Sequence, residues 1–386
     1  MVKEPKMNNL EELKMRTLEE CLEKPYLLLT PGPLTTSNGV RMAMLKDWCT
    51  WDKEYNNIVQ EIRDKLVKLA VPSGNYNNYT SVLMQGSGSF GVESVIGTAL
   101  PENGKLLILS NGSYGNRMGE IAQALKINYI IEKFGDKEII NIDKIREILE
   151  TNSDITHVSV VHSETTSGIL NPIEKIGELV KEFNKIFIVD AMSSFGGIEI
   201  DIEEVKADFM VSSSNKCIQG VPGFSFIICR KEVLENCSGQ ARSLSLDLYN
   251  QWKVMEENNG KWRFTSPTHT VRAFYQALIE LEKEGGIPAR EKRYRKNNSI
   301  LREGMKKLGF KILIPEEYQS PIITTFLAPT DSDYNFENFY YKLKKEGFVI
   351  YPGKITDIES FRIGNIGEIY PDDIYSLLKA IEKSMN

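Results

Sequence analysis

The sequence IFIVDAMSSFGGIEIDIEEVKADFMVSSSNKCIQG, residues 186–220, contains two short apolar runs, at 186–189 and 209–211. Continuous runs of this length are typical of strands that are covered on both faces, and such strands indicate a mostly parallel sheet in an α/β domain. The first run ends at Asp190, and the second leads through three serines to Lys216. Because ligands bind beyond the carboxyl ends of the strands in open α/β sheets, we expect both side chains at one site.

Similar apolar runs lie on either side of this stretch. They predict further buried strands at residues 81–84, 105–109, 129–131, 157–161 and 224–229. Helical patterns separate these runs, at residues 92–100, 118–125 and 172–183. The alternation of strands and helices favours an α/β fold over an all-helical or all-strand one.

The pattern changes near residue 275. A charged helical region at 277–308 is followed by a helix over 336–346, a C-terminal helix, and strands near 310–314, 322–326, 348–351 and 360–363. We therefore predict a large domain with a mostly parallel central sheet, residues 26–275, and a smaller α+β domain, residues 276–386. A chain of 386 residues is long enough for two such cores.

Composition excludes several classes of function. The chain is 41% hydrophobic and 26% charged with a net charge of −6, so no global field attracts nucleic acid or anionic lipid. No apolar run approaches the roughly 18 residues that span a bilayer, so we expect no membrane segment. Leucines among charges at 7–24 predict a helical N-terminal extension, residues 1–25, and no secretory signal. Five cysteines without a CxxC pair and three histidines without HExxH indicate a cytoplasmic protein with no metal site.

Residues 85–91, QGSGSFG, follow a predicted strand and begin a predicted helix. Backbone N–H groups at the start of a helix can hold a phosphate, and Gly88 lets the chain approach closely between the hydroxyls of Ser87 and Ser89. The segment matches neither the Walker pattern nor GxGxxG. Taken alone, it is equally well interpreted as a plain glycine-rich turn.

Asp190 and Lys216 each have an ordinary interpretation as well. An aspartate after a strand often caps the next turn, and a lysine at a strand end usually reaches solvent. A desolvated lysine, however, has a lowered pKa and can form an imine with a carbonyl. A phosphate cradle, an acid at one strand end and an amine at another are together the parts that a pyridoxal phosphate site needs.

The sequence resembles the fold-type-I pyridoxal phosphate enzymes, specifically the class V aminotransferases, and within them the group that uses 2-aminoethylphosphonate and pyruvate. The residues that carry the resemblance are 28–35, 85–89, 110–115, 162–166, 189–197, 215–223, 261–270 and 361–367. They span about residues 26 to 386, and the blocks around Lys216 and Thr265 are long and specific.

The resemblance implies how pyridoxal 5′-phosphate would be held. Lys216 would carry its aldehyde as a Schiff base and later move the substrate proton, and Asp190 would pair with the pyridinium nitrogen. Tyr114 would stack on the ring, a role that its flat face suits, and Thr165 would bond the phenolic edge. The phosphate would be held by Ser87, Gly88, Ser89, Ser213 and, from the neighbouring subunit of a homodimer with shared active sites, Thr265.

The resemblance also implies the substrates. Arg362 would bind the substrate anion, and the turn at 30–33, with Thr30 and Gly32, would form the wall opposite it. The implied reaction moves the amino group of 2-aminoethylphosphonate to pyruvate and gives phosphonoacetaldehyde and L-alanine, a step of phosphonate degradation.

Other interpretations remain open. The nearest keeps the chemistry and changes the substrate, as in a serine–pyruvate or alanine–glyoxylate aminotransferase of the same class. A cysteine desulfurase-like lyase would need a nucleophilic cysteine in the small domain, and no cysteine follows Cys237. A cofactor-free binding protein is difficult to reconcile with Asp190, Lys216 and Arg362 in one chain.

Overall fold

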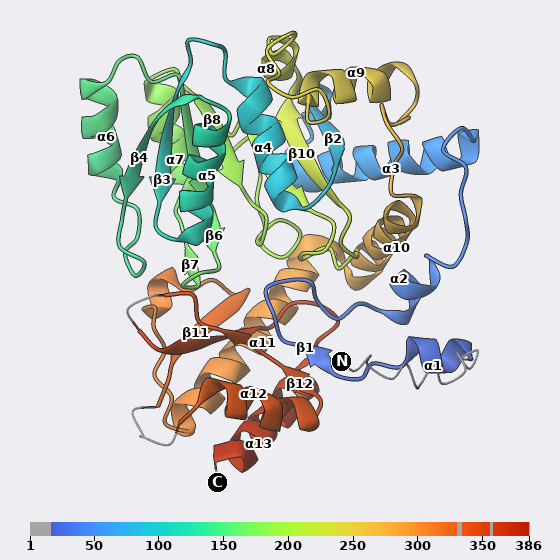
Figure 1. Ribbon diagram of the computed structural model, residues 1–386, viewed down its shortest axis with the longest axis vertical. Coiled ribbons are helices and arrows are strands. Elements are labelled where there is room, and N and C mark those ends of the chain that lie inside the picture. The colour runs from blue at the N-terminus through green and yellow to red at the C-terminus, as the bar shows by residue number, and fades with distance from the viewer. Residues whose placement is uncertain (1–16, 330–333, 356–357, 386) are drawn as a thin grey trace, which may run out of the picture.

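The computed structural model describes residues 17–329, 334–355 and 358–385 of the chain. Figure 1 shows a larger body around a central sheet and a smaller body, below it in this view, that contains the C-terminus. Helix α1 (Leu18–Leu22), which is capped by Thr17, lies beside the smaller body. The rest of the predicted N-terminal helix, residues 7–16, lies outside the described residues. Among the described helices, none is both long and apolar enough to cross a membrane.

A seven-stranded sheet forms the centre of the larger body. In order across the sheet, its strands are β2 (Tyr79–Gln85), β10 (Phe224–Arg230), β9 (Phe209–Ser213), β8 (Ile186–Asp190), β5 (His157–Val161), β3 (Lys105–Ser110) and β4 (Asn128–Lys133). β10 runs antiparallel to both neighbours, and the strands from β9 to β4 pair in parallel. Every residue of β5 and β9 is buried, which explains why their sequences are apolar without alternation. The predicted mostly parallel sheet is confirmed.

Helices cover this sheet. α4 (Gly88–Ala99) and α5 (Ser113–Ala124) follow β2 and β3 and lie in front of the sheet in Figure 1. A small hairpin, β6 (Ser163–Glu164) with β7 (Ile169–Leu170), follows β5. The other helices of the larger body are α2 (Asn38–Met42), α3 (Lys53–Ala70), η1 (Tyr76–Asn78), α6 (Ile142–Thr151), α7 (Ile173–Glu182), α8 (Lys231–Glu235), α9 (Leu248–Glu257) and α10 (Thr268–Glu284).

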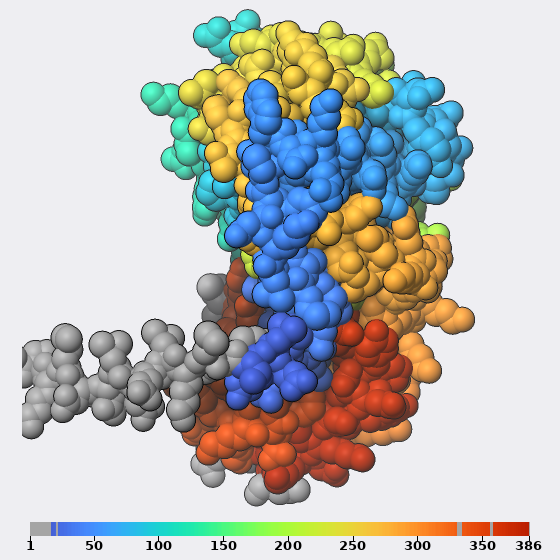
Figure 2. Space-filling view, turned by 90° about the vertical axis from the view of Figure 1, so that its right-hand side faces the viewer, coloured from blue at the N-terminus to red at the C-terminus, as the bar shows by residue number. Residues whose placement is uncertain are grey.

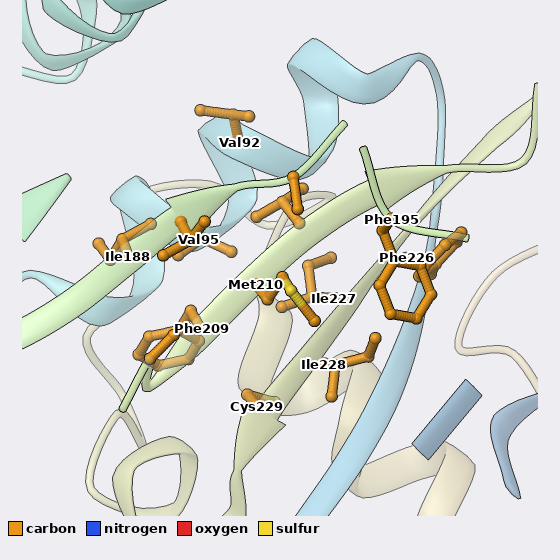
Figure 3. Close-up of a cluster of buried hydrophobic side chains, with 14 of the residues drawn as sticks. Val92, Val95, Ile188, Phe195, Phe209, Met210, Phe226, Ile227, Ile228 and Cys229 are labelled. Carbon is orange, nitrogen blue, oxygen red and sulfur yellow. The ribbon is translucent and has the colours of Figure 1, made fainter. Parts of the chain in front are cut away.

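The core between α4 and the sheet fixes the start of α4. Val92 and Val95 of α4 belong to one buried cluster with Ile188, Met210 and Ile227 of the strands (Figure 3). Burying one such side chain stabilises the fold by about 1.5–3 kcal/mol. Several of these contacts along one helix hold its N-terminus firmly at the carboxyl edge of the sheet.

The smaller body combines a three-stranded antiparallel sheet with three helices. The sheet has the order β11 (Ile323–Leu327), β14 (Ser360–Gly364), β13 (Tyr351–Pro352), and the helical elements are α11 (Gly286–Lys307), η2 (Glu316–Tyr318), α12 (Phe336–Lys345) and α13 (Pro371–Met385). The strand predicted near 310–314 is wrong: Ile312 makes only an isolated bridge to Phe326. Gly309, at φ +89°, and Pro315 bound this segment and leave no room for a longer ladder.

The two bodies are joined at both ends of the larger one. β1 (Leu27–Leu28) pairs in parallel with β12 (Phe348–Val349), and Leu29 packs in the smaller core. At the other end, α10 packs in the larger core as far as Leu281, and α11 contributes Leu301 to the smaller one. Residue 275 therefore lies within α10, and the change of core occurs along α11. Figure 2 shows the N-terminal segment, in blue, running along one side of both bodies.

Candidate active site

A cavity of about 230 Å³ lies at the carboxyl edge of the sheet. It brings together predicted residues that come from four different segments of the chain: Ser87, Gly88, Ser89, Tyr114, Asp190, Ser213 and Lys216. These segments follow β2, β3, β8 and β9, so the parallel sheet itself gathers them. Asn215, Arg117 and Met192 also line the cavity.

Lys216 is enclosed by the turn at residues 30–33. Its Nζ donates a hydrogen bond to the Pro31 carbonyl at 2.8 Å, and a Cβ on Gly32 would come within 2.9 Å of both its Cδ and Nζ. Gly32 has φ +118°, so a side chain there would be both strained and obstructive. Burial lowers the pKa of the Lys216 amine, and the nearby Tyr114 and Asp190 offset this only in part. The site therefore favours a neutral, nucleophilic amine.

Asp190 lies at the end of β8 and lines the same cavity. Its Oδ1 accepts a hydrogen bond from the Met192 amide at 2.9 Å. Burial raises the pKa of this carboxyl to about 6, and the Met192 bond and the Lys216 charge counteract it. A buried carboxylate with few partners can gain most from a cationic ring nitrogen beside it.

The N-terminus of α4 forms one wall of the cavity. Its N-cap residue Ser87 makes no capping bond with its side chain, so its hydroxyl is available to a ligand. A Cβ on Gly88 would overlap the Met192 side chain, which explains why this position is glycine. Across the cavity, Ser213 Oγ donates to Asn215 Oδ1 at 2.9 Å. Backbone N–H groups, hydroxyls and the helix dipole make this wall a suitable phosphate cradle.

Arg117 adds a positive charge to this cradle. It is not among the site residues that we predict from the sequence. Its Nη1 donates to Ser89 Oγ at 3.1 Å, and its guanidinium lies 5.1 Å from the centroid of the Tyr114 ring. The signal that could have revealed it is its position three residues after Tyr114, on the same face of α5.

Glu164 is a second residue that the sequence reasoning missed. It is fully buried, and its Oε2 accepts hydrogen bonds from the amides of Tyr114 at 3.2 Å and Gly115 at 3.4 Å. Its Oε1 accepts from the Thr166 amide at 3.0 Å. Burial raises the pKa of Glu164, and these hydrogen bonds oppose that rise. Glu164 thus caps α5 from another segment and fixes the backbone of Tyr114.

Tyr114 lines the cavity, and its hydroxyl lies near the side chain of Thr165. Burial acts to raise the pKa of the Tyr114 phenol, but the charges of Lys216 and Lys354 outweigh it and the pKa is lowered. Thr165 Oγ1 is buried and makes no hydrogen bond of normal geometry to the described residues, although the Tyr114 hydroxyl is near. An unsatisfied buried hydroxyl costs about 1–3 kcal/mol, which a ligand oxygen would recover.

Arg362 reaches the site from β14 of the smaller body and is 2% exposed. Its Nε donates to the Pro352 carbonyl at 3.0 Å and its Nη1 to the Thr165 carbonyl at 2.8 Å. These bonds fix the guanidinium and leave Nη2 without a hydrogen bond to the described residues. Thr30, in the turn against Lys216, is also buried, and a Cβ on Gly364 of β14 would overlap its carbonyl. The turn is thus packed between Lys216 and β14.

Thr265 does not join this group within one chain. It is exposed in the segment before α10 and is not among the residues that line the cavity. Its assignment to a neighbouring subunit's phosphate site stays a prediction. Within the described ranges, no cluster of three or more His, Cys, Asp or Glu residues could hold a metal ion.

Comparisons with known proteins agree with this geometry. A family model described as Aminotransferase class-V matches residues 41–355. The bifunctional phosphonoacetaldehyde hydrolase/aminoethylphosphonate transaminase of Clostridioides difficile (strain 630) is 56% identical over 98% of this chain, which spans 60% of that relative's length. The 2-aminoethylphosphonate–pyruvate transaminase of Vibrio vulnificus (strain CMCP6) is 59% identical over 94% of this chain and 99% of its own. The crystal structure of alanine–glyoxylate aminotransferase from Nostoc sp. shares the fold, with a TM-score of 0.85 and 24% identity over 94% of this chain and 95% of that one.

Proposed function

The chain belongs to the class V aminotransferases, and from this we propose that it moves the amino group of 2-aminoethylphosphonate to pyruvate, giving phosphonoacetaldehyde and L-alanine. The observation that carries the choice of substrates is the high identity, along almost the whole chain, to a relative named for this pair. The site supports the same reaction, because the cavity is lined by a buried amine and a buried acid, and the buried Arg362 is held nearby by its bond to the Thr165 carbonyl.

The residues of the cavity fit pyridoxal 5′-phosphate. The unsatisfied Thr165 hydroxyl suits the phenolic oxygen, Asp190 the ring nitrogen, and the Tyr114 ring the face of the cofactor. The start of α4, with Ser213 and Arg117, would hold the phosphate. When bound, this cofactor supplies an aldehyde for the substrate nitrogen and a protonated ring that acts as an electron sink.

Lys216 is the residue that would move protons. As a neutral amine, its Nζ can accept the proton from the amine-bearing carbon of the donor and later return a proton to the carbonyl-derived carbon of pyruvate. The Pro31 carbonyl restrains Nζ, and burial lowers its pKa and so favours the neutral amine that can accept a proton. Asp190 would hold a positive charge on the ring nitrogen opposite it.

Arg362 would position both substrates in turn. Its planar guanidinium can grip a phosphonate or a carboxylate, and the bonds to Pro352 and Thr165 fix it before either arrives. Thr30 and Gly32 would bound the pocket on the Lys216 side. The phosphonate stands one carbon farther from the reacting carbon than the carboxylate of pyruvate does, so the donor pocket must be longer than one for α-amino acids.

We place this enzyme in the cytoplasm as a homodimer whose partner completes each active site with Thr265. Large exposed apolar side chains support an interface: Leu45 is 68% exposed, Trp51 78% and Phe264, next to Thr265, 50%. Exposed aromatic residues of this kind commonly mark a contact between subunits. Closed two-fold dimers are also the commonest oligomers.

The proposed function is tested by an amino-donor screen with pyruvate as acceptor, in which alanine formation is measured. We expect 2-aminoethylphosphonate to be the best donor, and Lys216→Ala to form almost no alanine because it loses both the anchor and the proton carrier. If L-serine is the better donor, or if L-alanine with glyoxylate reacts faster, the alternative of a serine–pyruvate or alanine–glyoxylate aminotransferase replaces the proposal.

A further inference from the structure

The hairpin that carries Arg362 also carries a second cation. β13 pairs antiparallel with β14, so that Tyr351 lies opposite Arg362. The chain then leaves β13 through Gly353, whose amide donates to the Ser360 carbonyl at 2.9 Å. A Cβ on Gly353 would overlap the Ser360 side chain, so only glycine allows this close turn. The residue after it is Lys354.

Lys354 reaches across to the larger body. Its Nζ lies 3.3 Å from the Tyr114 hydroxyl and 4.5 Å from the centroid of the Tyr114 ring. Arg362, from the same hairpin, donates to the carbonyl of Thr165, whose side chain is near the same hydroxyl. Two cations of the smaller body therefore contact neighbouring segments of the larger one, and one of their partners, Tyr114, lines the cavity.

The two cations differ in how much of their binding capacity is already used. Arg362 is buried and donates hydrogen bonds from both Nε and Nη1 to backbone carbonyls. Lys354 is exposed, and its one hydrogen bond to the described residues is a long one to a phenol, so its other donors can turn to a ligand without losing a partner in that part of the chain. Its ammonium also makes no ion pair with the carboxylates of the described residues. Glu164, the buried acid in this region, is already satisfied by three backbone amides.

A doubly charged phosphonate needs more than one cation to neutralise it. It has three oxygens and carries up to two negative charges, whereas the carboxylate of pyruvate has two oxygens and one charge. One guanidinium neutralises one charge and can bond two oxygens at most in parallel. A second cation beside it would stabilise the dianion and contribute little to a monoanion.

On the basis of the proposed function, we propose that Lys354 is a specificity-determining residue whose ammonium binds the second negative charge of the phosphonate beside Arg362. Arg362 is then shared by both substrates, and Lys354 serves the donor. When a phosphonate enters, Lys354 exchanges its hydrogen bond to Tyr114 for a charge-assisted bond to a phosphonate oxygen.

The test uses unreactive ligands and the cofactor-loaded protein. Ethylphosphonate, ethanesulfonate and propionate lack the amine, and at mildly alkaline pH only the phosphonate is a dianion. Ethanesulfonate has the same tetrahedral shape with one charge, so it separates charge from shape. Titration calorimetry of wild type, Lys354→Gln, Lys354→Arg and Lys345→Gln gives the dissociation constants. Lys345 is an exposed lysine at the end of α12 and serves as the matched control.

We expect Lys354→Gln to weaken ethylphosphonate binding about tenfold or more, as loss of a hydrogen bond between charged groups does, and to leave ethanesulfonate and propionate within about threefold. Lys354→Arg should restore most of the phosphonate affinity, and Lys345→Gln should match wild type. In turnover, Lys354→Gln should raise KM for 2-aminoethylphosphonate with little change in kcat, and leave KM for pyruvate unchanged.

Equal weakening of all three ligands, or unchanged phosphonate affinity, in Lys354→Gln would overturn the assignment of Lys354 and leave the proposed function intact. The proposed function itself is refuted if the wild-type protein binds propionate more tightly than ethylphosphonate and does not turn over 2-aminoethylphosphonate. The wild-type measurements therefore distinguish the two failures.

Discussion

At the scale of single residues, burial acts on Lys216 and Asp190 in opposite directions. It lowers the pKa of the amine and raises that of the carboxyl, because both charged forms lose water. Burial thereby favours the neutral form of both the Lys216 amine and the Asp190 carboxyl, which line the same cavity. Burying these two ionisable groups costs folding stability, and the shifted pKa values become useful only when a ligand interacts with the amine and the carboxyl.

The Asp190 carboxyl should make the cofactor-free protein less stable as pH rises. Its pKa is about 6 when folded against an ordinary value of 3.8, so the folded state binds the proton more tightly. The associated stability is fully present below pH 3.8 and is lost as pH rises through about 6, an effect of about 3 kcal/mol. Urea unfolding of wild type and Asp190→Asn, across this pH range, measures it as the difference between the two proteins. A difference that does not change with pH would show that the pKa is not raised.

Arg362→Lys should damage both half-reactions. The lysine keeps the charge, but it loses the planar fork and the two backbone bonds that fix the guanidinium. We expect a loss of at least about tenfold in each single-turnover rate, from the 1.5–3 kcal/mol typical of such bonds. The rates are measured by following the cofactor absorption, first with 2-aminoethylphosphonate alone and then with pyruvate alone. If only one rate falls, Arg362 is not the shared anion site.

At the scale of elements, the start of α5 depends on a residue that is distant in sequence. Glu164 accepts hydrogen bonds from two backbone amides there and from the amide of Thr166, so Glu164→Ala should leave these three amides unsatisfied in a buried place and destabilise the protein by at least about 3 kcal/mol. Glu164→Gln keeps the shape and one acceptor oxygen, and should cost less. Denaturant unfolding of both variants measures the free energies. An Ala variant within about 1 kcal/mol of wild type would contradict this role of Glu164.

The strands of the large sheet could be predicted because each one is a continuous apolar run between helical patterns. The site residues at their ends could also be predicted, since the carboxyl ends of parallel strands share one edge. Glu164 and Lys354 could not be, because their partners Tyr114 and Gly115 come from other segments, and only the packed fold brings them together. Arg117 follows Tyr114 by three residues on α5, but its bond to Ser89 also depends on the packing of α5 against α4. The segment near 310–314 looked like a strand because it is apolar, but its neighbours limit it to a single bridge.

At the scale of the whole molecule, the proposed active site draws residues from both bodies, although the residues that line the cavity itself all belong to the larger one. The larger body supplies Lys216, Asp190 and the start of α4, and the smaller body supplies Arg362 and Lys354. Under the proposed function, the residues that hold the cofactor and those that bind the substrate anion belong to different cores. A change in how these bodies pack would alter substrate binding before it altered cofactor binding.

The homodimer is testable through Thr265. Sedimentation should show a dimer at assay concentrations, and Thr265→Ala should weaken cofactor retention by about 1–3 kcal/mol, as loss of a hydrogen bond to a charged group does. Cofactor retention is measured by dialysis against buffer and absorption of the remaining protein. Ser238→Ala, an exposed hydroxyl on the turn after α8, is the control. A fully active monomer would exclude a shared site.

A competition between two amino donors tests most directly whether the amino group of alanine comes from 2-aminoethylphosphonate. The enzyme receives pyruvate with equal amounts of ¹⁵N-labelled 2-aminoethylphosphonate and unlabelled L-serine, and the alanine formed is analysed by mass spectrometry. We expect the alanine to carry the ¹⁵N label and phosphonoacetaldehyde to accumulate in equal amount. Alanine that is mostly unlabelled would contradict this expectation, because the amino group would then have come from the α-amino acid.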